Sequence, residues 1–168
     1  PVRNAADVIS VFSDAYTNVA GSDFNPNWGQ ATVTTQTLIA GNNTLSYAGL
    51  NYQGLQFGSN QNVSTMGFLH LDYYTVNSTS LKVFLISPGP VETPFTLPTP
   101  TTGWNSVDIP LSAFSPVALN NLIQMKYDGN GDIYVDNIYF YRNPAPPVVP
   151  IVAAPVPTRP AADVLSVF

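Results

Sequence analysis

The chain has 168 residues, of which 9% are charged, and its formal net charge at neutral pH is −5. It contains no cysteine, which excludes disulfides, thiolate metal sites and a cysteine nucleophile. The five basic residues form no cluster, which argues against nucleic-acid binding, and no stretch of 18 apolar residues predicts a membrane span. A surface with so few charges must be covered by hydroxyls, amides and aromatic rings, and this chemistry suits neutral, hydroxyl-rich ligands.

Short stretches rich in Val, Ile, Thr, Tyr and Phe, separated by Gly, Pro and Asn, predict β-strands along most of the chain. In chain order the predicted strands are 7–12, 32–39, 45–52, 67–75, 80–87, 105–111, 122–127 and 133–141. Only 111–122 has any helical periodicity. We therefore expect an all-β fold, an antiparallel β-sandwich of the jelly-roll, galactose-binding-like form.

Two turns are predicted between these strands. Asn42–Asn43 precedes the strand at 45–52, and Asp128–Asp132 (DGNGD) precedes the last strand. The second segment has half the spacing of an EF-hand calcium loop but lacks the downstream Glu that would bind the ion with both oxygens. A hairpin turn is the better interpretation of DGNGD.

The two ends of the sequence repeat one another. PVRNAADVISVF at 1–12 and PTRPAADVLSVF at 157–168 agree at nine of twelve positions. Between them lies 143–160, NPAPPVVPIVAAPVPTRP, whose composition predicts a semi-rigid, extended linker. We therefore expect a module at 4–142, a linker at 143–160 and the start of a further tandem copy at 161–168. The sequence opens without a signal peptide, so it is expected to be a piece of a longer protein.

Several segments resemble a known family of modules. They are SDAYTNVAGSDFNPNWGQ at 13–30, FLHLDYYT at 68–75 with SLKVFLIS at 80–87, TTGWNSVDIPLSAF at 101–114 and the aromatic last strand IYVDNIYFY. Over most of 5–142 the chain is similar to jelly-roll carbohydrate-binding modules appended in tandem to secreted Bacteroidetes glycoside hydrolases and polysaccharide lyases. The resemblance implies a secreted, extracellular bacterial protein whose module binds glycan on a concave sheet face or at loop tips.

A structural calcium ion is a further implication of the resemblance, at a site where the first loop meets the last strand. Asp136 lies between apolar core candidates in that strand, where a carboxylate is costly unless it is paired or binds a cation. The loop offers Asp14, Asn18 and Asp23, and such oxygen ligands are those that calcium prefers. The alternative is that Asp136 faces solvent at a sheet edge.

Aromatic residues in turns are candidates for stacking on sugar rings, because a flat ring buries the CH-rich face of a pyranose at little entropic cost. Trp28, in NPNWGQ, is either such a platform or a plug over the end of the sandwich. Tyr52 and Tyr47 are further platform candidates, with Gln53 beside them to donate hydrogen bonds. Trp104 is expected to pack.

A polar sheet face is predicted from alternating residues in the strands. His70, Asp72 and Tyr74 share one face of their strand, and Lys82 and Lys126 are expected to join them. A His–Asp pair suggests acid–base chemistry, but the sequence has no nucleophile-elbow motif and nothing that marks a pair of catalytic carboxylates. Hydrogen bonding to sugar hydroxyls is the favoured role, and an ordinary solvated face is the alternative.

These features favour a non-catalytic module that binds a polysaccharide and anchors a secreted polysaccharide-degrading enzyme to its substrate. A β-glucan of the laminarin type is the preferred ligand. An alginate or another algal glycan is the runner-up, because Lys82 and Lys126 could meet uronate carboxylates. A spacer or adhesin repeat without a ligand is a different alternative. As a possible partner interaction, 161–168 could exchange for the first strand of a neighbouring molecule.

Overall fold

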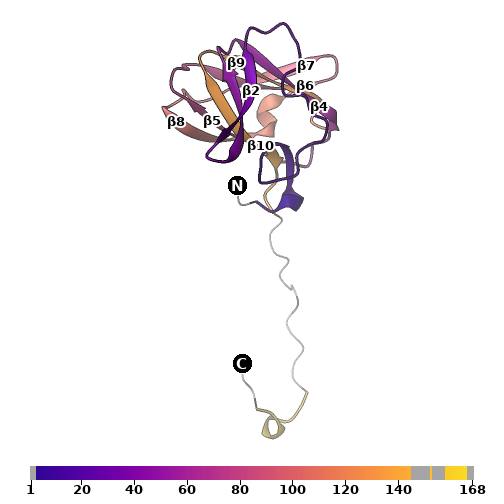
Figure 1. Cartoon of the computed structure of the whole chain (residues 1–168). Helices are drawn as coiled ribbons and strands as arrows, with labels where there is room; N and C mark the ends of the chain where they lie inside the picture. Colours follow the sequence, from indigo (N-terminus) through magenta and orange to yellow (C-terminus); the bar gives the residue numbers. More distant parts are fainter. Residues whose placement is uncertain (1–2, 145–151, 153–157, 166–168) are drawn as a thin grey trace.

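The computed structural model describes residues 3–144, 152 and 158–165 (Figure 1). Within them, ten strands lie between Val8 and Tyr141. They are β1 (Val8–Phe12), β2 (Val33–Ile39), β3 (Asn42–Ala48), β4 (Tyr52–Gln61), β5 (Phe68–Thr75), β6 (Leu81–Ser87), β7 (Val91–Thr96), β8 (Gly103–Pro110), β9 (Leu122–Gly129) and β10 (Ile133–Tyr141). Short 3₁₀ turns occur at Ala5–Asp7 (η1), Leu111–Phe114 (η2) and Ala161–Asp163 (η3).

The strands form two antiparallel sheets. The six-strand sheet has the order β2-β3-β10-β5-β8, and β1 pairs with the distal part of β10. The four-strand sheet has the order β4-β9-β6-β7. The predicted all-β sandwich is therefore confirmed.

The core lies between the two sheets and follows the alternation of the strands. In β5, Leu69, Leu71 and Tyr73 are buried, whereas the residues between them are half-buried on the outer face. In β9, Met125 and Tyr127 point inward in the same way. Because side chains alternate along a strand, each sheet contributes one apolar face to the core and leaves the other for polar and aromatic groups.

Two strands were missing from the prediction. β4 (Tyr52–Gln61) is rich in Gln, Gly and Ser, and β7 (Val91–Thr96) contains Pro94, so neither has a typical strand composition. The predicted strand at 45–52 covers the end of β3 and the first residue of β4. The helical pattern at 111–122 corresponds to the single turn η2.

Both turn predictions need correction. DGNGD does not close a hairpin, because β9 belongs to the four-strand sheet and β10 to the six-strand sheet. Its turn residues reverse the chain, but they carry the chain from one layer to the other. The hairpin between β2 and β3 turns at Ala40–Gly41, both with positive φ, and Asn42 and Asn43 are already in β3.

The tail segment at 158–165 is exposed and contains η3. Residues 166–168, the rest of the expected repeat, lie outside the described residues. None of the helices in the described parts of the chain is long and apolar enough to cross a membrane.

Candidate functional site

A groove lies on the outer face of the four-strand sheet and has a volume of about 380 Å³. Its lining combines aromatic, apolar and charged side chains: Trp28, Tyr52, Ile86, Pro90, Glu92, Gln124, Lys126 and Asp128. Strand pairing places several of these in rows. Tyr52 faces Asp128 across β4 and β9, and Ile86 lies between Gln124 and Glu92 across β9, β6 and β7.

Trp28 covers this face of the sheet at Gly54 of β4. A Cβ atom at position 54 would lie 2.4 Å from two carbon atoms of the indole ring, far inside van der Waals contact. Glycine is therefore required here for the ring to rest on the backbone. Trp28 stays half-buried, so one part of the indole packs on the strand and another part remains accessible at the groove.

Hydrogen bonds hold the loop that carries Trp28. The Tyr52 hydroxyl donates to the Trp28 carbonyl at 2.7 Å, and the Trp28 amide donates to Oε1 of Gln30 at 2.8 Å. Thr32 anchors the loop further on, with its hydroxyl 2.8 Å from the Tyr52 carbonyl. The two aromatic side chains are thus fixed relative to each other before any ligand binds, which lowers the entropic cost of binding.

The charges in and beside the groove are largely compensated. The Lys126 ammonium donates to both oxygens of Glu92 at 2.8 Å, across β6 from β9 to β7. The same ammonium lies 4.0 Å from the centre of the Phe84 ring, in a cation–π contact. Lys82 and Asp128 face one another in register between β6 and β9. Within the groove lining, Lys126 and Glu92 thus compensate each other, and Asp128 remains as a negative charge.

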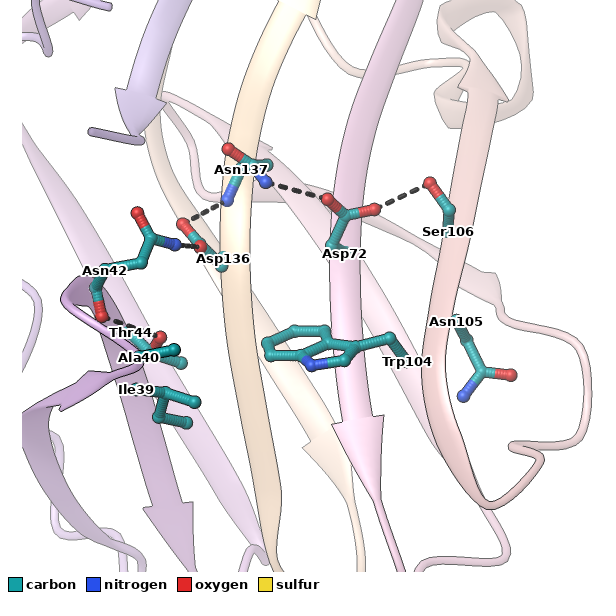
Figure 2. Close-up of a pocket in the computed structure, with 10 residues that line it drawn as sticks. All are labelled: Ile39, Ala40, Asn42, Thr44, Asp72, Trp104, Asn105, Ser106, Asp136 and Asn137. Carbon is teal, nitrogen blue, oxygen red and sulfur yellow. Dashed lines mark hydrogen bonds between the residues drawn. The ribbon is translucent and has the colours of Figure 1, made fainter. Parts of the chain in front are cut away.

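The outer face of the six-strand sheet holds a second pocket, of about 360 Å³, on the opposite side of the sandwich. Figure 2 shows Trp104 reaching from β8 across its centre toward β10. Trp104 is 49% exposed, so the expectation that it packs is only partly met. Its ring lies 5.7 Å from that of Tyr74, which in turn lies 6.1 Å from Tyr134.

Two carboxylates oppose each other in this pocket. Asp72 of β5 and Asp136 of β10 are paired in register, and like charges in this position destabilise a sheet. Burial raises the pKa of Asp136, and the charges of Asp14 and Asp72 raise it further, although Asn137 and Asn42 donate hydrogen bonds to it. Because Asp136 is only 3% exposed, burial destabilises its charged form more than that of Asp72.

Asp72 has the opposite character. Burial opposes its ionisation, but hydrogen bonds from His70, Ser106 and Asn137 hold its pKa below the usual value. The Ser106 hydroxyl donates at 2.6 Å and the Asn137 amide at 2.8 Å, as Figure 2 shows. Asp72 is therefore an ionised carboxylate whose oxygens are already occupied by protein donors.

His70 lies beside this pocket between two acidic groups. Its Nδ1 is 2.8 Å from Asp108, its Nε2 is 3.4 Å from Asp72, and its ring stacks on Tyr139 at 4.6 Å. Burial lowers the pKa of His70, but the two carboxylates outweigh it and raise the pKa above the usual value. With both nitrogens engaged, His70 is a structural cross-link and not an available base.

The predicted polar face therefore divides into two faces. Trp28, Tyr52, Lys82 and Lys126 lie on the outer face of the four-strand sheet, whereas His70, Asp72 and Tyr74 lie on the opposite side of the sandwich. The predictions for Gln53 and Tyr47 are wrong, because both are fully buried. Gln53 points inward, where it accepts from Thr34 and donates to the Gly54 carbonyl.

Two charged residues of the groove were not predicted from the sequence. Glu92 was not a candidate because β7 was not predicted as a strand, and its position near Lys126 depends on that strand. Asp128 was assigned to the turn, although it is two residues after Lys126 and continues the outward side of β9. The period-two alternation from Gln124 through Lys126 was the signal that could have found it.

The four predicted calcium ligands do not form one site. Asp14 accepts two bonds from Asn43, Asn18 accepts from Ser10, and Asp23 bonds to Gln56 through the backbone. In the described part of the chain, no three acidic, His or Cys side chains are grouped as a metal site would need. The predicted role of Asn18 and Asp23 as calcium ligands stays a prediction. Calcium at Asp136, with Asp14 and Asp72 close enough to affect its pKa, stays a prediction.

Solved structures share this fold at low sequence identity. A mutant of a family 29 carbohydrate-binding module has a TM-score of 0.55 and 14% identity, and the match covers 79% of this chain and 89% of that one. The module CtCBM11, studied in solution, has a TM-score of 0.53 and 16% identity over 82% and 96% of the two chains. A family 28 module specific for non-crystalline cellulose has a TM-score of 0.51 and 17% identity over 75% and 90%. No protein-family model and no curated protein matches the sequence. The chain thus has the β-sandwich fold of carbohydrate-binding modules.

Proposed function

We propose that the chain is a non-catalytic polysaccharide-binding module and that the groove over the four-strand sheet is its binding site. The observation that supports this most is the Trp28 ring, held on Gly54 beside Tyr52, at a groove lined with hydrogen-bonding side chains. A preformed aromatic surface with a few polar groups around it is typical of sites for sugar rings.

A neutral glycan fits the groove better than an acidic one. Lys126 is the cation best placed to meet a uronate carboxylate, but Glu92 already accepts both of its short hydrogen bonds. Asp128 adds a negative charge to the lining. We therefore favour a β-glucan of the laminarin type over alginate. One of the solved structures with this fold is described as specific for non-crystalline cellulose, which is also a β-glucan. This description agrees with the choice of a β-glucan.

The groove carboxylates support binding and not hydrolysis. A glycosidase needs one carboxylic acid that can donate a proton and a second carboxylate across the scissile bond. In the groove, both carboxylate oxygens of Glu92 already accept hydrogen bonds from the Lys126 ammonium. In a longer protein with an enzyme domain, the module would hold that enzyme at its substrate.

Affinity electrophoresis tests the proposal, with gels that contain laminarin, alginate, agarose or xylan. We expect laminarin to retard the wild type most. Trp28→Ala should lose about 30-fold or more in affinity, since a central aromatic contact contributes about 2 kcal/mol or more. Trp104→Ala, which removes the exposed indole of the opposite face, is the matched control and should bind as the wild type does. Unchanged mobility in all four gels would contradict the proposal and favour a spacer without a ligand. Equal losses in the two variants would contradict the assignment of the binding site to the groove over the four-strand sheet.

A further inference from the structure

β1 completes the six-strand sheet through its pairing with β10 and through buried side chains. β1 runs antiparallel to the distal part of β10, from the pair Val8–Tyr141 to the pair Phe12–Ile138. Val11 is fully buried and Phe12 is 5% exposed, so the strand completes the apolar core as well as the sheet. Loss of β1 would leave core side chains and the backbone groups of β10 without partners.

Polar side chains fix β1 in this position. The Arg3 guanidinium lies 3.3 Å from the centre of the Tyr141 ring. Asp7 accepts from Nε of Arg142 at 2.9 Å, and its carbonyl accepts from the Arg142 amide at 3.1 Å. The Ser10 hydroxyl donates to Asn18 at 2.6 Å.

The repeated sequence near the C-terminus keeps every residue type that makes these contacts. Residues 157–168 align with 1–12, and the positions equivalent to Arg3, Asp7, Ser10, Val11 and Phe12 are identical. They are Arg159, Asp163, Ser166, Val167 and Phe168. Three positions differ between the copies, and the structure describes two of them in the first copy. Asn4, which is exposed, is replaced by Pro, and Ile9, which is half-buried, is replaced by Leu. The repeat therefore keeps the five residues named above, and at Ile9, which pairs with Phe140, it has another apolar residue.

The second copy also has the same local backbone where the structure describes it. η1 and η3 are both 3₁₀ turns with the sequence AAD. The residue after each turn is extended, with φ −128° and ψ 138° at Val8 and φ −129° and ψ 126° at Val164. The exposed tail at 161–165 thus begins in the conformation that β1 has when it joins β10.

We propose that residues 161–168, preceded by Arg159, contain a second β1 that occupies the β1 position of another copy of this module. Strand exchange of this kind needs no new interface, because the contacts already exist within one copy. The Pro-rich composition of 143–160 predicts a semi-rigid linker, and such a linker favours another copy over a return to its own module. The module's own β1 is tethered and competes at an effective concentration of roughly millimolar, so exchange dominates when β1 is weakened or when copies are concentrated.

Full-length variants with matched changes in the two copies test this proposal. Val11→Asp places a charge at a fully buried position of β1. The unchanged tail of another copy should then pair with β10 more favourably than the module's own β1 does. Val167→Asp makes the same change in the tail, and a third variant carries both. The readouts are molar mass by light scattering and the melting temperature. We expect Val11→Asp to be folded with at least twice the monomer mass, Val167→Asp to be monomeric with wild-type melting, and the double variant to be monomeric and less stable than Val11→Asp.

Two results would overturn the proposal. Equal mass and melting temperature for Val11→Asp and the double variant would mean that the tail does not replace β1. A monomeric Val11→Asp that melts above the double variant would mean that the tail folds back onto its own module. If Val11→Asp does not fold, Asp7→Ala serves instead, because it removes only the Arg142 ion pair. Asp7→Ala should then associate more than Asp7→Ala/Asp163→Ala at equal concentration, and equal association would count against the exchange.

Discussion

The two outer faces of the sandwich carry similar residue types but use them differently. On the four-strand sheet, Lys126 and Glu92 reach across a strand to neutralise each other, and Trp28 and Tyr52 remain at the groove. On the six-strand sheet, Asp72 accepts hydrogen bonds from the short side chains of Ser106 and Asn137 on the adjacent strands, and Asp136 is buried. The first arrangement leaves a preformed, nearly neutral surface, whereas the second uses its polar groups to hold strands together.

A binding face and a structural face are distinguished by what their polar atoms already contact. His70 and Asp72 look like functional residues by type, but their hydrogen-bonding capacity is taken up by each other and by Asp108 and Ser106. Substitutions that change one face at a time test this distinction.

The largest effect is expected for Gly54→Ala on the groove. The new Cβ would overlap the indole of Trp28, so the ring must leave the strand. We expect a loss of laminarin affinity close to that of Trp28→Ala and a loss of stability of about 1–3 kcal/mol from overpacking. Gly67→Ala is the control, because its nearest atom is 3.9 Å away. Calorimetric titration and thermal melting measure both quantities; wild-type affinity in Gly54→Ala would show that Trp28 is not the platform.

A change of specificity is expected for Glu92→Gln. Removing this carboxylate leaves the Lys126 ammonium without its counter-charge and lowers the negative charge of the groove. Alginate should then retard the variant where it does not retard the wild type, while laminarin affinity changes less than about threefold. Glu92→Gln/Lys126→Met should lose the new alginate binding. If alginate binds all three proteins equally, the charge balance of the groove does not select the ligand.

A moderate gain of stability is expected for Asp136→Asn on the opposite face, measured in EDTA. The raised pKa of Asp136 means that the folded state binds its proton more tightly than the unfolded state does. The wild type should therefore gain stability as the pH falls from neutral toward that pKa, and the variant should lack this gain. At neutral pH we expect the variant to melt a few degrees higher, because a neutral amide avoids the repulsion from Asp14 and Asp72. A lower melting temperature would contradict this account.

The predicted calcium ion would also act at Asp136. A bound cation would stabilise the folded state with Asp136 ionised, whereas without the ion the Asp136 charge is destabilising. We expect calcium to raise the melting temperature of the wild type relative to EDTA and to leave Asp136→Asn unchanged, since an ion that binds only the folded state stabilises it. Identical melting of the wild type in calcium and in EDTA would reject the calcium prediction.

The smallest effect is expected for His70→Asn. Because the folded pKa of His70 is raised, its charge stabilises the fold below the usual histidine pKa, and this contribution is lost as the pH rises through the folded pKa. The variant should thus be less stable than the wild type at pH 5, and the difference should be smaller at pH 8. Laminarin binding should not change. A pH-independent difference would show that stacking on Tyr139, and not charge, is what His70 contributes.

The sequence was sufficient for strands with strong alternation or dense β-branched and aromatic residues. Phe68–Thr75 and Ile133–Tyr141 were placed almost to the residue for this reason. β4 and β7 were missed because Gly, Gln and Pro hide their alternation, and these two strands form both edges of the four-strand sheet. Without them, the sequence could identify Trp28 and Lys126 as candidates but could not tell which polar residues share their face.

The chain crosses between the two sheets at six of its nine strand-to-strand connections. Only the connections β1–β2, β2–β3 and β6–β7 stay within one sheet. Because no sheet can form from one continuous segment, the folding nucleus must bring distant segments together, and such topologies fold on the scale of milliseconds to seconds. β10 pairs with β1, β3 and β5, so a growing chain cannot complete the six-strand sheet until residues 133–141 have been synthesised.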